Sequence, residues 1–265
     1  MKIAIIGAGN MGGALARGLA KGSIIPTSNI YVSNPSTAKL DALKAEFSEI
    51  NVMTDNRAAT AAADVVVLAV KPWKVEEVLN EIKPSMDYKR QTVASMVGGL
   101  GIAQLSVWLD KGDGILPATY LIIPNTAIAT MSSMTFITSA RSTSAQDSRL
   151  LDIFNELGEA MLVDEDHIAA GTSLASCGIA YALRYIRAAM EGGVELGFRA
   201  DDAKRIVMQT MRGAVDILEA NNSHPEAEID RVTTPGGLTI KGLNAMESAG
   251  FTPSVIDGLR ASTKR

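Results

Sequence analysis

The chain has 265 residues, of which 47% are hydrophobic and 20% are charged, and its formal net charge is -4. This balance is typical of a globular protein and excludes a disordered chain, and a length well above about 150 residues predicts two domains. The acidic surplus argues against nucleic acid as a partner, and no apolar run approaches the roughly 18 residues that cross a membrane.

Cysteine and histidine are scarce, which limits the chemistry open to the chain. A single cysteine, Cys177, excludes an intramolecular disulfide framework, and His167 and His224 are too few to complete a structural zinc site with it. Neither histidine has carboxylates in a triad-like spacing, so we expect surface or capping roles for both. The apolar N-terminus is interrupted at Gly7, which predicts a strand rather than a secretion signal. We therefore expect no metal and a cytoplasmic location.

The first half of the chain alternates short β-branched runs with helical patterns. Because continuous apolar runs suit strands that are buried on both faces of a parallel sheet, this alternation predicts a doubly wound domain. The runs come in the order strand 2–7, helix 11–22, strand 29–34, helix 36–47, strand 64–70 and helix 73–83, with further strands expected at 92–97, 120–123, 134–138 and 160–163.

From about residue 164 the strand patterns vanish and long helical patterns follow. We therefore expect an α/β protein with a Rossmann-like doubly wound sheet in residues 1–163 and an all-α domain in residues 164–265. The helical half is too elongated and apolar to be stable alone, so we expect it to mediate dimerisation. The Ser/Thr-rich composition of residues 139–148 predicts a polar connecting segment. The expected helices are 172–196, 200–220, 239–249 and 253–261.

A G-x-G-x-x-G motif follows the first predicted strand and opens the first predicted helix. The glycines permit a tight turn and a close approach of the backbone to a pyrophosphate, which then lies at the positive end of the helix. An isolated motif of this kind is often only a glycine-rich turn, but its place at the head of a βαβ series predicts dinucleotide binding. The motif comprises Gly7, Gly9, Asn10, Met11 and Gly12.

The end of the second strand predicts which dinucleotide is preferred. An NAD site usually carries an acidic residue there to hold the ribose 2′-hydroxyl. This strand instead ends in Ser33 and Asn34, which offer donors to a 2′-phosphate, with Lys39 nearby. We therefore predict a preference for NADPH, with NADH also possible, although an Asn-Pro turn without a cofactor role would fit the same residues.

Two more predicted strands end in residues that suit a ligand site. Val70, Lys71 and Pro72 end one strand, and Pro124 and Asn125 follow another. Ligands of open α/β sheets bind beyond the carboxyl ends of the strands. Lys71 is expected to face a cofactor or substrate anion, and Asn125 to orient the nicotinamide or a loop. A strand-ending lysine is also common as a solvated edge charge.

The octet VTTPGGLT, residues 232–239, stands before a predicted helix. Taken alone, it is explained by a proline-glycine turn and by a helix cap at Thr239. Together with GAGNMG at 7–12, Asp55-Asn56, VKP at 70–72 and PNT at 124–126, it resembles the pyrroline-5-carboxylate reductase family nearly from end to end. The octet is similar to the C-terminal motif of that family and is far more specific than the glycine motif.

The resemblance implies an N-terminal domain that binds NAD(P)H, Asn56 among its cofactor contacts, and a helical domain that interleaves with a partner subunit. It implies reduction of 1-pyrroline-5-carboxylate to L-proline by hydride transfer to the imine carbon, in a homodimer or larger homo-oligomer. Gly236 and Gly237 would turn backbone N–H groups toward the substrate carboxylate, and Thr239 would lie beside the imine nitrogen. Thr234 is expected to assist as a second hydroxyl. Val232, Thr233, Pro235 and Lys71 complete the expected substrate site.

The chain departs from the family pattern near the expected substrate. Cys177 and Ile179 replace a serine and a proline, Ala127 replaces a second proline after Pro124, and Arg187 replaces an acidic residue. These departures leave open a reductase of another cyclic imine or small acid on the same fold. They also leave open a dinucleotide sensor without turnover.

Overall fold

The computed structural model describes residues 1–263 and divides into two compact units, Met1–Ser176 and Cys177–Arg265. The last two residues of the expected helical domain, Lys264 and Arg265, lie outside the described residues. The division falls after the last strand, in the segment that the sequence analysis assigned to the helical domain. No helix in the described part of the chain is both long and apolar enough to span a membrane.

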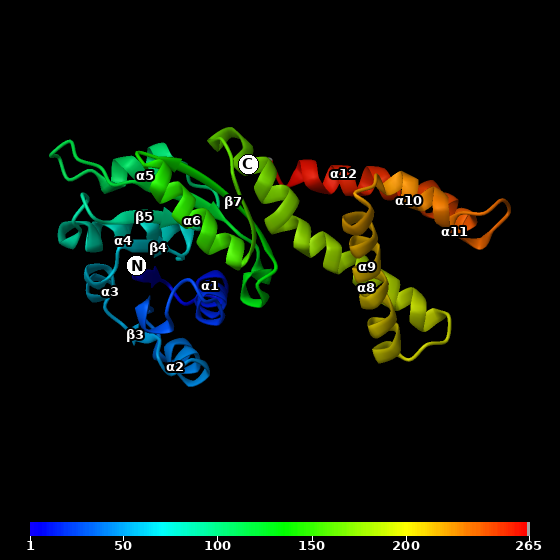
Figure 1. Ribbon diagram of the computed structural model, residues 1–265, viewed down its shortest axis with the longest axis horizontal. Helices are drawn as coiled ribbons and strands as arrows, with labels where there is room; N and C mark the ends of the chain where they lie inside the picture. The colour runs from blue at the N-terminus through cyan, green and yellow to red at the C-terminus, as the bar shows by residue number, and fades with distance from the viewer. Residues whose placement is uncertain (264–265) are drawn as a thin grey trace. The chain divides into compact units, whose positions relative to one another are not determined.

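The first unit is built on an eight-stranded sheet with the order β3-β2-β1-β4-β5-β6-β7-β8 (Figure 1). All neighbouring pairs are parallel except β6 and β7. The chain order reverses between β1 and β4, which makes their carboxyl ends the switch point of the sheet. The strands are β1 Ile3–Ile6, β2 Ile30–Ser33, β3 Asn51–Met53, β4 Val65–Leu68, β5 Thr92–Ser95, β6 Thr119–Ile123, β7 Ser133–Ala140 and β8 Gly158–Leu162.

Helices cover both faces of this sheet, which confirms the predicted doubly wound fold. One buried cluster joins the sheet to α1, α2 and α6, and a second joins it to α3, α4 and α5. The central strands β1 and β4 bury every residue because both of their faces are covered. The helices are α1 Asn10–Lys21, α2 Thr37–Glu46, α3 Asn56–Ala62, α4 Val75–Ile82, α5 Ile102–Leu109, α6 Ser144–Glu156 and the short α7 Ile168–Gly171.

The polar segment 139–148 was expected to be a connection, and that expectation is wrong. β7 continues to Ala140, and α6 begins at Ser144 with a capping box in which Thr143 and Gln146 satisfy each other's backbone N–H groups. Such a box starts a helix even in a polar segment because it supplies partners for N–H groups that the helix cannot satisfy itself. The elements β3, α3, α5 and α10 were also missed, because each is too short to give a clear pattern.

Helices are the only regular elements of the second unit as far as residue 263, as predicted. α8 and α9 form a helical hairpin, and α12 contacts α8 through an edge-on ring contact between Phe251 and Tyr185 and a hydrogen bond from the Tyr181 hydroxyl to the Gly258 carbonyl. The predicted start of α8 was too early, because residues 172–177 form a π-helical stretch instead. The helices are α8 Gly178–Glu195, α9 Ala200–Asn221, α10 Pro225–Val232, α11 Leu238–Ser248 and α12 Phe251–Ala261.

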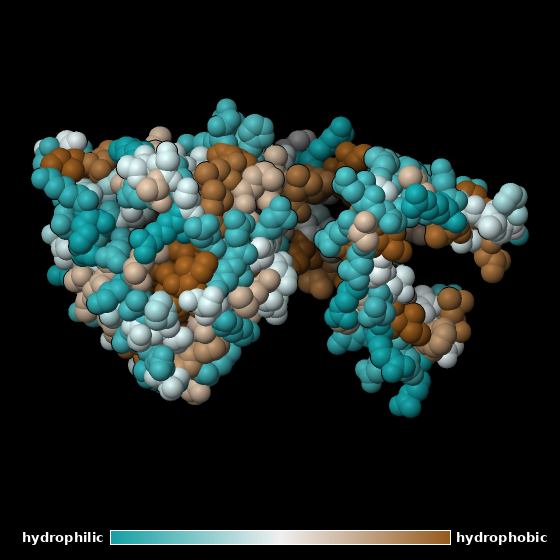
Figure 2. Space-filling view, in the orientation of Figure 1, coloured by the Kyte–Doolittle hydropathy of each residue, from teal (hydrophilic) through white to brown (hydrophobic). Residues whose placement is uncertain are grey.

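These helices bury almost none of their own residues. Ala203 on α9 is the one buried residue on the described parts of α8 to α12. Hydrophobic side chains therefore lie open on their surfaces, as the brown patches of Figure 2 show. Exposed apolar side chains in this number are typical of a subunit interface. The large exposed side chains include Tyr181, Leu183, Tyr185, Val194, Ile206, Val215, Ile217, Leu238 and Phe251.

Candidate functional site

A cavity of about 760 Å³ opens at the carboxyl ends of β1 to β5. It lies where the strand order reverses, which is the position at which open α/β sheets bind their ligands. The structure brings nine of the predicted cofactor residues to its lining: Gly7, Gly9, Asn10, Met11, Asn34, Asn56, Val70, Lys71 and Pro72. The lining also includes Lys39, Lys74, Glu77, Glu81 and residues 96–98.

The three glycines of the loop after β1 have different roles. Gly7 has a φ of +106°, and a Cβ there would come within 2.7 Å of the Ala69 carbonyl oxygen. A Cβ on Gly12 would stand 1.9 Å from the Gly7 carbonyl oxygen, so this position holds the helix close to the loop. A Cβ on Gly9 would meet nothing within 4 Å. The open space at Gly9 is where a pyrophosphate approaches the backbone in dinucleotide sites.

The first turn of α1 suits an anion. Gly9 provides no side-chain cap, and the turn carries no acidic residue, so the first N–H groups and the positive helix end face the pocket unopposed. Asn34 holds the loop in place, because its Oδ1 accepts a 3.0 Å hydrogen bond from the Ala8 N–H and its Nδ2 donates to the Ser36 carbonyl. The arrangement fits the diphosphate of a dinucleotide.

A hydrogen-bonded series runs from β2 to α4 at one side of the pocket. The Ser33 hydroxyl donates to Asn56 Oδ1 at 2.7 Å, and Asn56 Nδ2 donates to Glu81 Oε2 at 2.9 Å. Ser33 is fully buried and reaches the pocket only through Asn56. Sequence reasoning missed Glu81, because it lies 25 positions from Asn56 on a helix whose acidic residues resemble a solvated face.

The residues after β4 and β6 fall in different places. Lys71 is exposed and lines the pocket, and the neighbouring Lys74 is paired with Glu77 at 2.7 Å. Asn125 is buried and does not line the pocket. Its Oδ1 accepts from the Ala127 N–H and its Nδ2 donates to the Ala175 carbonyl at 3.4 Å. A contact between Asn125 and the cofactor stays a prediction.

The predicted substrate residues belong to the second unit, except for Lys71. Residues 234–237 form a turn closed by a 2.9 Å hydrogen bond from the Gly237 N–H to the Thr234 carbonyl. Gly236 has a φ of +72°, the left-handed conformation that a type II turn requires after proline. A Cβ on Gly237 would stand 2.6 Å from Thr234 Oγ1, so glycine is required here as well. The proline and both glycines of the octet are thereby explained.

This turn differs from the sequence expectation in one respect. The N–H of Gly237 is used inside the turn, so it is not a second free donor beside that of Gly236. Free N–H donors are found instead at the start of α11, where Gly237 provides no side-chain cap and the first turn again carries no acidic residue. Thr239 is the second residue of α11 and is exposed. Val232 ends α10, and the Thr233 hydroxyl donates back to the Ile229 carbonyl.

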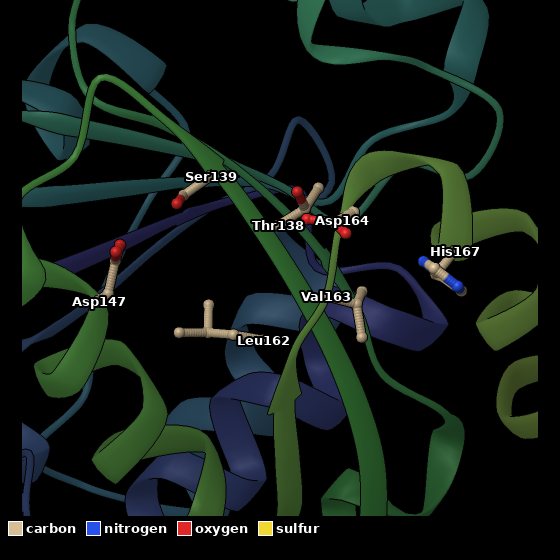
Figure 3. A pocket seen from close by; sticks show the side chains of 7 residues that line it. All are labelled: Thr138, Ser139, Asp147, Leu162, Val163, Asp164 and His167. Atoms are coloured by element: carbon tan, nitrogen blue, oxygen red, sulfur yellow. The ribbon is translucent and has the colours of Figure 1, made fainter.

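A separate hollow of about 500 Å³ lies along β7 and the end of β8 (Figure 3). It contains none of the predicted site residues. Figure 3 shows Asp147 on one side of it and Asp164 and His167 on the other, and Asp147 accepts a hydrogen bond from the Tyr120 hydroxyl. Within residues 1–263, no group of three or more His, Cys, Asp and Glu side chains is placed to hold a metal ion. His224 caps α10 through Nδ1, as expected.

Two family models match the chain. Residues 165–265 match the pyrroline-5-carboxylate reductase dimerisation family, and residues 2–99 match the family described as NADP oxidoreductase coenzyme F420-dependent. The match to residues 2–99 covers the glycine loop and the whole cavity lining, and the match to residues 165–265 covers the helices α8 to α12.

Named relatives match the chain over almost its full length. Pyrroline-5-carboxylate reductase 2 of Dictyostelium discoideum is 35% identical over 99% of this chain and 91% of its own. Pyrroline-5-carboxylate reductase 1 of the same organism is 38% identical over 99% of this chain, which spans only 49% of that relative. The crystal structure of the Plasmodium falciparum pyrroline carboxylate reductase with NADP bound superimposes with a TM-score of 0.89 at 28% identity, covering 99% of this chain and 95% of the other. The chain belongs to the pyrroline-5-carboxylate reductase family.

Proposed function

We propose that the protein reduces 1-pyrroline-5-carboxylate to L-proline with NAD(P)H. The observation that carries this proposal is the full-length similarity to named reductases, because it includes both the glycine loop of the first unit and the Pro235–Gly237 turn of the second. Residues 1–163 would bind the dinucleotide, and residues 164–265 would bind the substrate and the partner subunit.

The reduced nicotinamide, when bound, supplies a hydride for the imine carbon. The protein's own residues have to bind the cofactor and the substrate and orient them toward each other. The space at Gly9 and the uncapped end of α1 hold the diphosphate, and Lys71 adds a positive charge to the same cavity. Holding two small reactants in a reactive orientation can contribute about 7–11 kcal/mol, so little further machinery is required.

The turn before α11 would bind the substrate carboxylate. Its supports are the N–H of Gly236, the uncapped N–H groups that begin at Leu238, and the positive end of the α11 helix. Thr239 lies in the first turn of the same helix, so its hydroxyl would reach the imine nitrogen of a substrate whose carboxylate sits at the helix end. In 1-pyrroline-5-carboxylate the carbon that bears the carboxylate is bonded directly to the imine nitrogen, so the two groups lie close enough together to meet the helix end and the Thr239 hydroxyl at once. Thr234 would support the turn through its contact with Gly237.

We further propose NADPH as the preferred cofactor and a homodimer or larger homo-oligomer as the working assembly. The exposed apolar residues of α8 to α12 support the assembly, because a second copy of the chain would bury them. The cytoplasmic location expected from the single cysteine stays a prediction.

The test is a steady-state assay of NADPH consumption with freshly prepared pyrroline-5-carboxylate. NADH, other cyclic imines and small hydroxy acids are assayed in parallel. The proposal expects rapid turnover of pyrroline-5-carboxylate and a higher kcat/KM with NADPH than with NADH. Turnover confined to another imine, which the departures at Cys177 and Ile179 would then explain, contradicts the substrate. Cofactor binding without any turnover contradicts the enzyme assignment and favours a dinucleotide sensor.

A further inference from the structure

Glu81 places a carboxylate close to the end of β2. In dinucleotide folds, an acidic residue at this strand end binds the ribose 2′-hydroxyl and disfavours a 2′-phosphate. The sequence places none there, because β2 ends at Ser33 and Asn34 follows it. The structure brings one from α4 instead, since Glu81 lines the cavity and its Oε2 lies 2.9 Å from Asn56 Nδ2.

The chemistry of these groups fixes the direction of the hydrogen bonds. A carboxylate only accepts, so the amide nitrogen of Asn56 has to face Glu81. Asn56 Oδ1 then faces Ser33, whose hydroxyl has to donate its proton. Ser33 is therefore not the donor to a 2′-phosphate that its position in the sequence suggested. One N–H of Asn56 is left for an oxygen of the ligand.

The charge of Glu81 lies close to the end of β2, which is where dinucleotide folds bind the ribose 2′ group. The two hydrogen bonds and the width of the carboxamide place Ser33 Oγ and Glu81 Oε2 no more than about 8 Å apart. Arg57 donates to the backbone carbonyl of Glu81 and not to its carboxylate, and none of the ion pairs among residues 1–263 includes Glu81. Over this distance, a 2′-phosphate experiences a repulsion that a 2′-hydroxyl does not. Lys39, on the same cavity, acts in the opposite direction.

We propose that Glu81 is a positioning residue that sets cofactor selectivity: it holds the carboxamide of Asn56, and its charge reduces the preference for NADPH over NADH. The proposal rests on the NAD(P)H site of the proposed function. It assigns to α4 the role that an acidic residue at the end of β2 has in other dinucleotide folds.

The test compares two ligands that differ only in the 2′-phosphate. Adenosine 2′,5′-bisphosphate and adenosine 5′-monophosphate are titrated calorimetrically into the full-length protein and into its Glu81→Gln variant, which keeps the length and the hydrogen-bonding capacity of the side chain. We expect the variant to raise the affinity ratio in favour of the bisphosphate by about fivefold or more. The ratio of kcat/KM for NADPH and NADH should change in the same direction.

Glu76→Gln is the matched control, because Glu76 lies on the same helix, is exposed and does not line the cavity. It changes the net charge equally and should leave the ratio within about twofold. An unchanged or lowered ratio in Glu81→Gln overturns the proposal, as does an equal rise in Glu76→Gln. If Glu81→Gln does not fold, Glu81→Met removes the same charge and carries the same expectation.

The two proposals fail in different ways. A protein that binds both adenosine ligands but reduces no pyrroline-5-carboxylate loses the proposed function, while the ligand ratio still decides the role of Glu81. A protein that reduces pyrroline-5-carboxylate with NADPH but shows an unchanged ligand ratio in Glu81→Gln keeps the proposed function, and the role of Glu81 is overturned.

Discussion

Each compact unit begins a helix at a glycine that provides no side-chain cap: Gly9 precedes α1 in the first unit and Gly237 precedes α11 in the second. The surroundings of the two glycines differ. The loop before α1 is tied to the sheet by hydrogen bonds from Gly7 N–H to Ser33 and from Ala8 N–H to Asn34. The turn before α11 is closed by its own Thr234–Gly237 bond, on helices that bury almost nothing.

The difference teaches which parts of the site one chain can build alone. The cavity at the carboxyl ends of β1 to β5 draws its lining and its support from the first unit, so one chain forms it without a partner. The second unit leaves Leu238, at the start of α11, 86% exposed. A second copy that covered the apolar helices would support the proposed substrate turn, which the second unit by itself leaves exposed.

The largest expected effect comes from placing a charge on the exposed apolar surface of the second unit. Leu183→Glu on α8 should weaken self-association by about 3 kcal/mol or more, because assembly would bury an unpaired charge. Leu183 is 58% exposed in the single chain. Sedimentation should show smaller species, and activity should fall while NADPH still binds. Val107→Glu on α5, at 68% exposure in the first unit, is the control and should stay assembled.

A Leu183→Glu protein that stays assembled and active would contradict the view that the second unit, unlike the first, depends on a partner copy. It would mean that the surface of α8 around Leu183 stays in solvent in the working protein.

The next prediction compares two glycines of the loop after β1: Gly12, which is needed for packing, and Gly9, which leaves space for the ligand. Gly12→Ala should lower the free energy of unfolding by about 2–3 kcal/mol, because its Cβ would stand 1.9 Å from the Gly7 carbonyl oxygen. Gly9→Ala should leave stability nearly unchanged, because its Cβ meets no protein atom within 4 Å, yet weaken NADPH binding at least about tenfold. Denaturant unfolding and calorimetry measure the two quantities. Equal behaviour of the two variants would contradict the distinct roles.

A smaller effect tests the turn of the second unit. Thr239→Ala should raise KM and lower kcat/KM by about tenfold, because one hydrogen bond to the substrate is lost. Thr239→Ser keeps the hydroxyl and should keep most of the activity. Unchanged kinetics in Thr239→Ala would remove Thr239 from the site, and equal losses in both variants would point to packing rather than hydrogen bonding.

The smallest expected effect depends on pH and concerns the first unit. Burial raises the pKa of Glu156, but hydrogen bonds from the Ser23 hydroxyl and from the backbone N–H groups of Ser23 and Ile24 outweigh it and hold the pKa below its usual value. A lowered pKa stabilises the folded state above the unfolded-state pKa of about 4.3, and the contribution is lost as the pH falls through the folded value.

Glu156→Gln should therefore cost about 1 kcal/mol or less at neutral pH, since the group is largely solvated and screened. The difference from the unmodified protein should shrink toward zero in acid. Urea unfolding at a series of pH values measures it. A difference that grows on acidification would have the wrong sign for this account.

Sequence patterns predicted the fold well where apolar runs were long. The strands β1 and β4 are buried on both faces and gave continuous runs, and the long helices α8 and α9 gave clear periodicity. β3 has only three residues and α6 starts in a polar segment, so neither produced a pattern. In α6 the capping box was present in the sequence at Thr143 and Gln146 and could have indicated the helix.

The candidate site was predictable where its residues are consecutive. The glycine loop and the Pro235–Gly237 turn each depend on neighbours in sequence, so local backbone rules indicated both. The place of Glu81 in the site was not predictable. It depends on a hydrogen bond between Asn56 on α3 and Glu81 on α4, and no local sequence pattern indicates a contact between residues so far apart. The direction of the Ser33 hydroxyl follows only once Glu81 is in place.

The most direct test of the account follows the hydride itself. Pyrroline-5-carboxylate is incubated with the protein and with NADPH that carries deuterium at both positions of C4, so that transfer from either face delivers the label, and the product is examined by NMR. The account predicts L-proline that carries deuterium at its δ carbon, the former imine carbon. Proline without deuterium, deuterium at another carbon, or no proline at all would contradict it.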